Sequence, residues 1–258
     1  MSRSSEDPAR QAVATLPGGR GADRPRREAE LARKVKGWLT ARALPAFEGA
    51  DLESFSRPGH QAGGDFFDVM AVDQNRWGIL LGQASGSGYH AALSASVALS
   101  YFRSAAPGTL SPAELLSSVN NLLFAYRTAT SASITAAYAI YDVRDRTLLL
   151  ANAGQCHPLL NGRATEVAGL PLGLGREARF PQLALTLKPG ESLVWYTSGI
   201  ASVPRVAGDL LGLDGWIALV REQTAGSERP WALRDRLEEA IGDSLSNEDV
   251  SFVAMVTK

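Results

Sequence analysis

Residues 65–88 read DFFDVMAVDQNRWGILLGQASGSG, and this stretch decides the fold class. Two runs rich in β-forming residues, 66–72 and 77–81, flank the polar segment 73–76, which is the pattern of an antiparallel hairpin. A loop of small residues, 82–88, follows the hairpin, and the helix-favouring segment 89–104 comes next. The stretch therefore favours an antiparallel sheet packed against helices.

The same organisation continues outward from this stretch. Ser111-Pro112-Ala113-Glu114 is a capping box with proline at the first helical position, so a second helix begins there. Strands are predicted near 51–55, 133–141, 147–152, 157–160, 183–187, 192–196 and 250–256, and helices at 213–221 and 233–241. Because the strands come in hairpin-linked groups and the helices in pairs, the sequence predicts an α+β layered architecture.

Composition excludes several classes of protein. The chain has 258 residues, of which 45% are hydrophobic and 21% charged, which supplies a sizeable core. A net charge of −1 gives no field that would attract nucleic acid or anionic lipid. The single cysteine, Cys156, excludes an internal disulfide and favours a reducing cytoplasm. No apolar run is long enough to cross a membrane, and no signal peptide is recognisable.

The N-terminal part differs from the rest of the chain. Residues 1–36 carry nine basic and five acidic side chains, whereas the remainder has a net charge of −5. Residues 1–27 are rich in Pro and Gly and predict a flexible tail. Residues 28–45 predict an amphipathic lead-in helix, whose apolar face holds Leu31, Val35, Trp38 and Leu39 and which Pro45 ends. We expect this face to be covered by the domain, residues 46–258, or by the same helix of a second copy in a homodimer.

The sequence gives little support for a catalytic nucleophile or for a nucleotide-binding loop. Cys156 and His157 are adjacent on a predicted strand, so their side chains would point to opposite faces, and a buried structural cysteine is the better interpretation. His60 and His90 have no partner at the spacing of metal ligands. The loop 85–88 lacks the lysine and the spacing of a phosphate-binding loop.

Acidic residues at predicted strand ends are more informative. Asp65 and Asp68 lie in a Gly-rich block, and Glu248 and Asp249 precede the last strand. Carboxylates from separate strand ends can converge on a hard divalent cation. Aspartate beside glycine is also common in ordinary turns, which is the competing interpretation.

Six blocks of sequence, in this order, resemble the metal-dependent (PPM, type 2C) serine/threonine phosphatases of the bacterial SpoIIE-like class. The resemblance extends over roughly residues 30–257. The blocks are Gly63-Gly64-Asp65-Phe66-Phe67-Asp68, residues 82–93, Asn152-Ala153-Gly154-Gln155, Leu187-Lys188-Pro189-Gly190-Glu191, Tyr196-Thr197-Ser198-Gly199-Ile200 and Glu248-Asp249-Val250-Ser251.

The resemblance implies a four-layer α-β-β-α sandwich of two mainly antiparallel sheets flanked by helices. It implies two Mg²⁺ or Mn²⁺ ions at one end, which activate a water that attacks a phosphoserine or phosphothreonine. It also implies a phosphorylated anti-anti-sigma type of partner in partner-switching signal transduction. The loops at the site would contain Gly64, Gly86, Gly88 and Gly199.

This sequence departs from the family pattern at the metal ligands. The metal-bridging Asp of the family aligns with Gln83, and a second ligand Asp aligns with Ser198. Asp65 and Asp249 are retained, while Glu248 stands at the first position of the final acidic pair. The family's histidine aligns with Gln155, to which the sequence assigns no role.

Two neutral side chains at ligand positions predict a degenerate site, because each lost carboxylate removes a full charge at contact distance from the cations. We therefore expect a pseudophosphatase that binds a regulatory phosphoprotein without efficient turnover, and that holds at most one weakly bound Mg²⁺ or Mn²⁺. The metal candidates are Asp65, Asp68, Glu248 and Asp249, and no catalytic residue is assigned. The alternatives are an active phosphatase with an altered metal site and a structural domain without a phosphoprotein partner.

Overall fold

The structure is a computed structural model, and it describes residues 37, 44–59, 63–86, 88–125, 133–225, 231–244 and 246–258. The expected tail, residues 1–27, and most of the expected lead-in helix, residues 28–45, lie outside the described residues.

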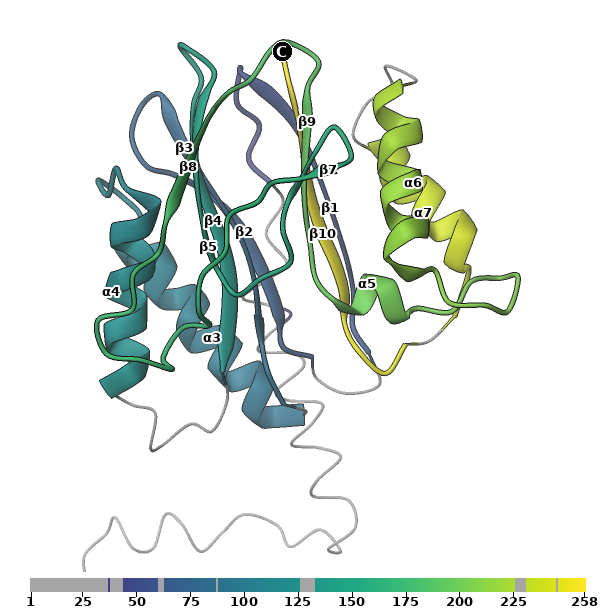
Figure 1. Ribbon diagram of the computed structural model, residues 1–258, viewed down its shortest axis with the longest axis horizontal. Coiled ribbons are helices and arrows are strands. Elements are labelled where there is room, and N and C mark those ends of the chain that lie inside the picture. Colours follow the sequence, from purple (N-terminus) through teal and green to yellow (C-terminus); the bar gives the residue numbers. More distant parts are fainter. Residues whose placement is uncertain are drawn as a thin grey trace, which may run out of the picture.

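Two antiparallel sheets of five strands each pack face to face, with helices on both outer faces (Figure 1). Sheet A has the order β1-β10-β9-β6-β7, and sheet B has the order β2-β3-β4-β5-β8. The strands of sheet A are β1 (Ala50–Arg57), β10 (Val250–Thr257), β9 (Ser192–Tyr196), β6 (Leu159–Leu160) and β7 (Arg163–Ala164). Those of sheet B are β2 (Asp65–Ala71), β3 (Arg76–Ala84), β4 (Ile134–Asp142), β5 (Thr147–Ala153) and β8 (Gln182–Thr186).

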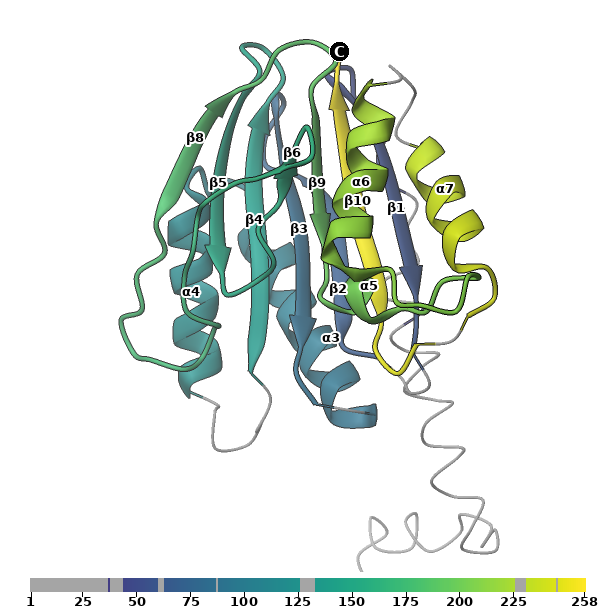
Figure 2. The same ribbon diagram turned by 45° about the vertical axis from the view of Figure 1, so that its right-hand side comes forward.

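Helices cover the outer face of each sheet, which confirms the predicted α-β-β-α sandwich (Figures 1 and 2). Sheet B is covered by α3 (Gly88–Ala105) and α4 (Pro112–Ala125), and sheet A by α6 (Gly212–Ala225) and α7 (Trp231–Ile241). The short helix α5 (Gly199–Ser202) follows β9 directly. At the start of α4, the Ser111 hydroxyl accepts the Glu114 N–H at 3.2 Å, so the predicted N-cap is confirmed.

Three hydrophobic layers result from the alternation of side chains along the strands. On β3, Ile79 and Leu81 face the other sheet, whereas Leu80 faces α3 and α4. On the other side of the molecule, Phe252 packs with Trp216 under α6. Because central strands are buried on both faces, they read in the sequence as nearly continuous apolar runs.

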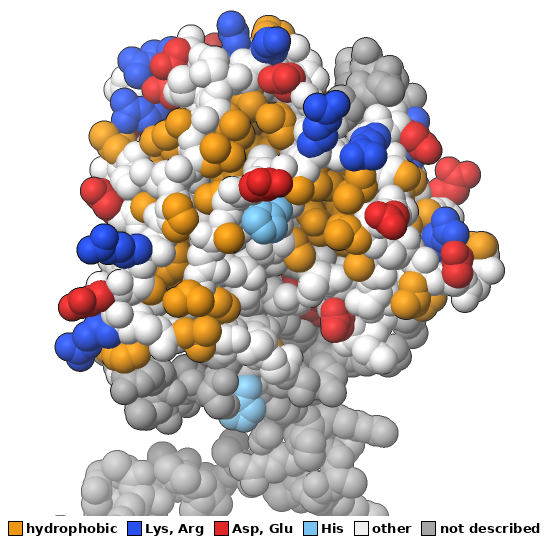
Figure 3. Space-filling model, in the orientation of Figure 1, with side chains coloured by type: hydrophobic (Ala, Val, Ile, Leu, Met, Phe, Trp, Pro, Cys, Tyr) orange, Lys and Arg blue, Asp and Glu red, His pale blue; other side chains and the backbone are white. Residues whose placement is uncertain are grey.

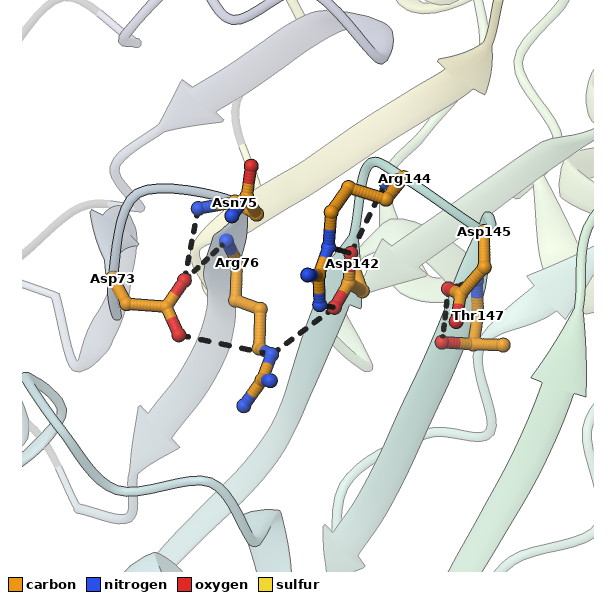
Figure 4. A network of polar contacts seen from close by, with 7 residues as sticks. All are labelled: Asp73, Asn75, Arg76, Asp142, Arg144, Asp145 and Thr147. Carbon is orange, nitrogen blue, oxygen red and sulfur yellow. Dashed lines mark hydrogen bonds and ion pairs between the residues drawn. The ribbon is translucent and has the colours of Figure 1, made fainter.

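The predicted hairpin at 73–76 is confirmed, and polar contacts join its turn to that of the next hairpin (Figure 4). One Asp73 carboxylate oxygen accepts the N–H of Asn75 at 2.8 Å and of Arg76 at 2.9 Å. Asp142 accepts hydrogen bonds from Arg76 Nε at 3.1 Å and from Arg144 Nη2 at 2.9 Å. The bond from Arg144 lowers the pKa of Asp142. These contacts fix the end of sheet B that lies opposite Asp65.

One strand prediction needs correction. The run 157–160 forms only the two-residue strand β6, which pairs with β7 across a tight turn. The residues before it are held in a loop, in which Asn152 accepts the N–H of Gln155 at 2.8 Å and donates to its carbonyl at 2.9 Å. Pro158 has no N–H to give to a strand ladder, so pairing starts after it.

No helix in the described part of the chain is long and apolar enough to cross a membrane.

Candidate functional site

The candidate site lies where β2 begins and β3 ends. Asp65 and Gln83 are opposite each other in the β2–β3 register, and their side chains share the face that looks toward sheet A. Asp65 is buried, with 2% of its surface exposed, whereas Gln83 is half-buried. The alternation of side chains along the hairpin therefore places the first pair of predicted ligand positions side by side.

Thr197 connects Asp65 to sheet A. Thr197 follows β9 and is completely buried, and its hydroxyl donates to Asp65 Oδ2 at 2.7 Å. The same hydroxyl accepts the N–H of Ser251 in β10 at 3.1 Å. A hydrogen bond to a buried carboxylate is among the stronger polar contacts in proteins, so this one holds the two sheets together at the site.

Asp249 makes a second connection between the sheets. Its Oδ2 accepts the N–H of Asp65 at 3.0 Å, and its Oδ1 accepts the N–H of Gly59 at 2.9 Å. The neighbouring backbone approaches so closely that a Cβ at position 63 would lie 1.6 Å from Asp249 Oδ2. A Cβ at Gly199 would lie 2.0 Å from the Asp249 carbonyl oxygen. Both glycines are therefore required by close approach to Asp249.

The two neutral residues at predicted ligand positions, Gln83 and Ser198, contact each other. The Ser198 hydroxyl lies 3.3 Å from Oε1 of Gln83 and donates to it. Glu248 is exposed and accepts a hydrogen bond from the Ser202 hydroxyl of α5 at 3.2 Å. Gln83, Ser198 and Glu248 thus each have a hydrogen-bond partner within the protein.

The structure does not bring Asp68 to this site. Asp68 is three residues from Asp65 on the same strand, so the two side chains point to opposite faces of sheet B. The Asp68 carboxylate forms an ion pair with Arg103 of α3 and accepts the N–H of Val69 at 2.9 Å. Its role there is to join β2 to the helical layer.

The predicted loop glycines surround the site. Gly64 passes so close to β3 that a Cβ would lie 2.1 Å from the carbonyl oxygen of Ala84. Gly86 has φ +98°, a backbone conformation that favours glycine. Gly88 begins α3 and Gly199 begins α5.

The structure also places Gln155, Cys156 and two of the three histidines. Gln155 is buried, and its Oε1 accepts the N–H of Cys156 at 2.8 Å. Cys156 is partly buried, and burial raises the pKa of its thiol. His157 Nδ1 lies 2.6 Å from the carbonyl oxygen of Thr165, and His90 is exposed in the first turn of α3. His60 lies outside the described residues.

The donors at this site do not fit a dinuclear metal centre. Gln83 and Ser198 offer neutral oxygens, and both oxygens of Asp249 already accept backbone N–H groups. Within the described ranges, no group of three or more His, Cys, Asp or Glu side chains is arranged to hold a metal ion. A cation would have to share Asp65 Oδ2 and the Asp249 oxygens with the hydrogen bonds that they already accept.

Thr197 is the site residue that sequence reasoning did not single out. It stands beside Ser198 in the quoted block Tyr196-Thr197-Ser198-Gly199-Ile200, and a threonine at the end of a buried strand is the available signal. Its partner Asp65 is 132 positions away in the chain, so spacing alone could not pair them.

Comparison with known proteins agrees with the fold. The family model described as Stage II sporulation protein E (SpoIIE) matches residues 73–258. A comparison with curated proteins gives no match. The solved SiaA-PP2C domain of Pseudomonas aeruginosa is 17% identical, covers 93% of this chain and 99% of its own, and has a TM-score of 0.73.

Two further solved structures share the fold. The RsbU and RsbW domains of Rv1364c from Mycobacterium tuberculosis are 24% identical, with a TM-score of 0.68, and the match covers 83% of this chain but only 62% of that one. RsbX in complex with magnesium is 13% identical, with a TM-score of 0.61, and the match covers 84% of this chain and 99% of that one. Because the family model covers most of the chain and the fold agrees with it, the chain belongs to the SpoIIE family of PP2C-type phosphatase domains.

Proposed function

We propose that this chain is a signalling pseudophosphatase, which binds a regulatory phosphoprotein without efficient turnover. The contact between Gln83 and Ser198 carries the proposal, because these residues stand at two ligand positions of the family and bond to each other at 3.3 Å. Neither can supply the negative charge that a pair of divalent cations requires.

The hydrogen bonds of the retained carboxylates support the same conclusion. Asp65 accepts from Thr197, and Asp249 accepts two backbone N–H groups. A cation would compete with these hydrogen bonds for the carboxylate oxygens, and a hydrogen bond to a charged group is worth about 1.5–3 kcal/mol. We therefore propose that the site holds at most one Mg²⁺ or Mn²⁺, weakly, with Asp65 among the ligands.

The proposed partner is a phosphoprotein of the anti-anti-sigma type. Support comes from the names of the related structures, RsbU, RsbW and RsbX, together with the family membership. We further propose a cytoplasmic location, from the single cysteine, and a homodimer through residues 28–45, from their apolar stripe.

An active Mn²⁺- or Mg²⁺-dependent phosphatase with an altered site is the second candidate. The observation that favours it is the retention of Asp65 and Asp249 side by side, with the Asp65 N–H bonded to Asp249 Oδ2 at 3.0 Å. Such an enzyme would bind metal through these carboxylates and Glu248.

Three measurements on the full chain separate the candidates. Calorimetric titration with Mn²⁺ should show one weak site or none, and hydrolysis of a phosphoserine peptide should stay at the level of a buffer control. Binding of the same peptide, measured by fluorescence anisotropy, should persist in chelator. Two tight Mn²⁺ sites, or turnover that requires Mn²⁺, would overturn the proposal in favour of the enzyme.

A further inference from the structure

Strand β8 is the outermost strand of sheet B, and one of its edges has no neighbouring strand (Figure 2). On its other edge β8 pairs with β5, where Leu183 and Leu185 lie opposite Leu150 and Leu148. Just after the strand, the N–H of Leu187 donates to the carbonyl of Arg146 at 2.9 Å. Because the bonding direction alternates along an antiparallel strand, odd-numbered residues bond to β5. The main-chain groups of Gln182, Ala184 and Thr186 therefore point outward.

These outward groups have no hydrogen-bond partner in the part of the chain that the structure describes. The strand reads Gln182-Leu183-Ala184-Leu185-Thr186, with no charged residue and no proline. Natural proteins usually protect an edge strand with charge, proline or a bulge, because a bare edge pairs with other strands. This edge lacks the first two of these protections along its whole length.

A pocket of about 580 Å³ lies beside β8, between it and the β6–β7 hairpin of sheet A. Leu160, Leu183 and Leu185 form part of its wall. Hydrophobic side chains also gather on this face of the molecule, over β8 and between β7 and α6 (Figure 3). A strand added to β8 would place alternate side chains in this pocket.

The rim of the pocket is self-complementary in charge. Arg163 and Glu166 both line it, both are exposed, and neither has an ion-pair partner among the residues described. Glu191 on the same rim already accepts from Asn161 at 3.1 Å and from the Lys188 N–H at 2.8 Å. In a two-fold contact, Arg163 of each copy would meet Glu166 of the other.

We propose that the occupant of this edge is a second copy of the chain, paired through antiparallel β8 strands about a two-fold axis at Ala184. Ala184 would exchange both its hydrogen bonds with Ala184 of the second copy, and Gln182 would do so with Thr186. This gives about six inter-chain hydrogen bonds. Leu183 would lie opposite Leu185 of the second copy and extend the layer between the sheets.

A second copy is favoured over another partner because the β8 edge and the charged rim of the pocket are complementary to themselves. An uncharged strand pairs with itself without repulsion, and the free cation and free anion of the rim neutralise each other. This interface is separate from the proposed 28–45 contact, and it does not depend on the state of the Asp65 site.

The test measures the dissociation constant of the full chain by analytical ultracentrifugation from micromolar to submillimolar concentration. Ala184→Pro removes the outward N–H, and an edge strand tolerates this change. Ala184→Val keeps the N–H and serves as the control. We expect Ala184→Pro to weaken dimerisation at least about tenfold and Ala184→Val to leave it within about threefold.

Charge-reversal variants test the rim of the pocket while leaving the sequence of β8 unchanged. Arg163→Glu and Glu166→Arg should each weaken the dimer about tenfold, and the double variant should restore it. A chain that stays monomeric at every concentration would overturn the proposal. A dimer whose dissociation constant is unchanged by Ala184→Pro and by the single charge reversals would also overturn it, since such a dimer would form through another surface. Failure of the double variant to recover would equally reject the proposed two-fold pairing.

Discussion

The Ser198 hydroxyl donates a hydrogen bond to Gln83 Oε1 across 3.3 Å, and so joins the end of β9 to the end of β3. Ser198 lies between β9 of sheet A and α5, and Gln83 lies in β3 of sheet B, so the contact spans the sandwich at its site end. The family resemblance implies carboxylates at both positions, and two carboxylates this close together would repel each other unless a cation or a proton lay between them. Two neutral side chains can make this contact without such repulsion.

Restoring the charges should restore metal binding. Gln83→Asp combined with Ser198→Asp should increase Mn²⁺ affinity at least about tenfold and raise hydrolysis of a phosphoserine peptide above wild type. In chelator the double variant should be less stable than wild type, and Mn²⁺ should recover the loss by mass action. Calorimetry and thermal unfolding with and without Mn²⁺ measure both effects.

The matched control is Gln83→Asn with Ser198→Asn, which has the size of the aspartates without their charge. It should neither gain Mn²⁺ affinity nor respond to chelator. If the aspartate variant behaves like this control, then Gln83 and Ser198 do not occupy metal-ligand positions.

Asp249 should be a structural residue in the absence of metal. Asp249→Asn places an NH₂ group against one of two backbone N–H donors, so we expect a loss of about 1–3 kcal/mol in the free energy of unfolding in chelator. Glu248→Gln, at an exposed neighbour, should change it by less than about 0.5 kcal/mol. Urea unfolding measures both. An Asp249→Asn variant more stable than wild type would instead indicate mutual repulsion among carboxylates awaiting a cation.

Much of the fold follows from local signals, whereas the site contacts do not. The hairpin turn at Asp73 and the cap at Ser111 are set by neighbouring residues, so the sequence predicts both. The strand alternation likewise places Asp65 beside Gln83 once the hairpin is known. These features need no knowledge of how the two sheets meet.

Contacts between layers could not be predicted in this way. The Thr197–Asp65 bond joins residues of different sheets, and the Asp68–Arg103 pair joins a strand to a helix. Both depend on the relative position of packed layers, which the sequence of either element alone does not encode. The sequence places Asp68 with Asp65 in one glycine-rich block at a strand end, although the strand period sends the Asp68 side chain to the opposite face.

Glu53 should make stability depend on pH. It lies on β1 under α7 with 5% of its surface exposed, and burial, together with the nearby Asp235 and Glu238 carboxylates, raises its pKa to about 8. A carboxyl with a raised folded-state pKa binds a proton more tightly when folded, so stability falls as pH rises from about 4.5 to about 8.

Glu53→Gln removes this proton linkage. The variant should be more stable than wild type by about 2–4 kcal/mol at pH 8 and similar to it near pH 4.5. Urea unfolding across this pH range checks the difference, and Glu239→Gln, at an exposed residue of α7, is the control. A difference that does not vary with pH would show that Glu53 does not titrate in this window.

Asp142 should make stability depend on pH in the opposite direction. Hydrogen bonds from Arg144 and Arg76 lower its pKa below the usual 3.8, so its contribution is present above that pH and is lost as pH falls through the folded-state value. Asp142→Asn should cost about 1 kcal/mol at pH 7, and this difference should shrink below pH 4. Chemical unfolding at pH 7 and pH 3 measures this difference, and Asp243→Asn, at an exposed residue after α7, is the control. Equal costs at both pH values would contradict the assignment.

The place of β10 in sheet A sets an order of events during synthesis. β10 lies between β1 and β9, although β1 is translated near the start of the domain and β10 near its end. While the nascent chain emerges, β1 remains unpaired with β10, its neighbour in sheet A among the described residues. Long-range pairing of this kind is slow and exposes the chain to aggregation. Asp249 directly precedes β10, so the last strand to be made also completes the site.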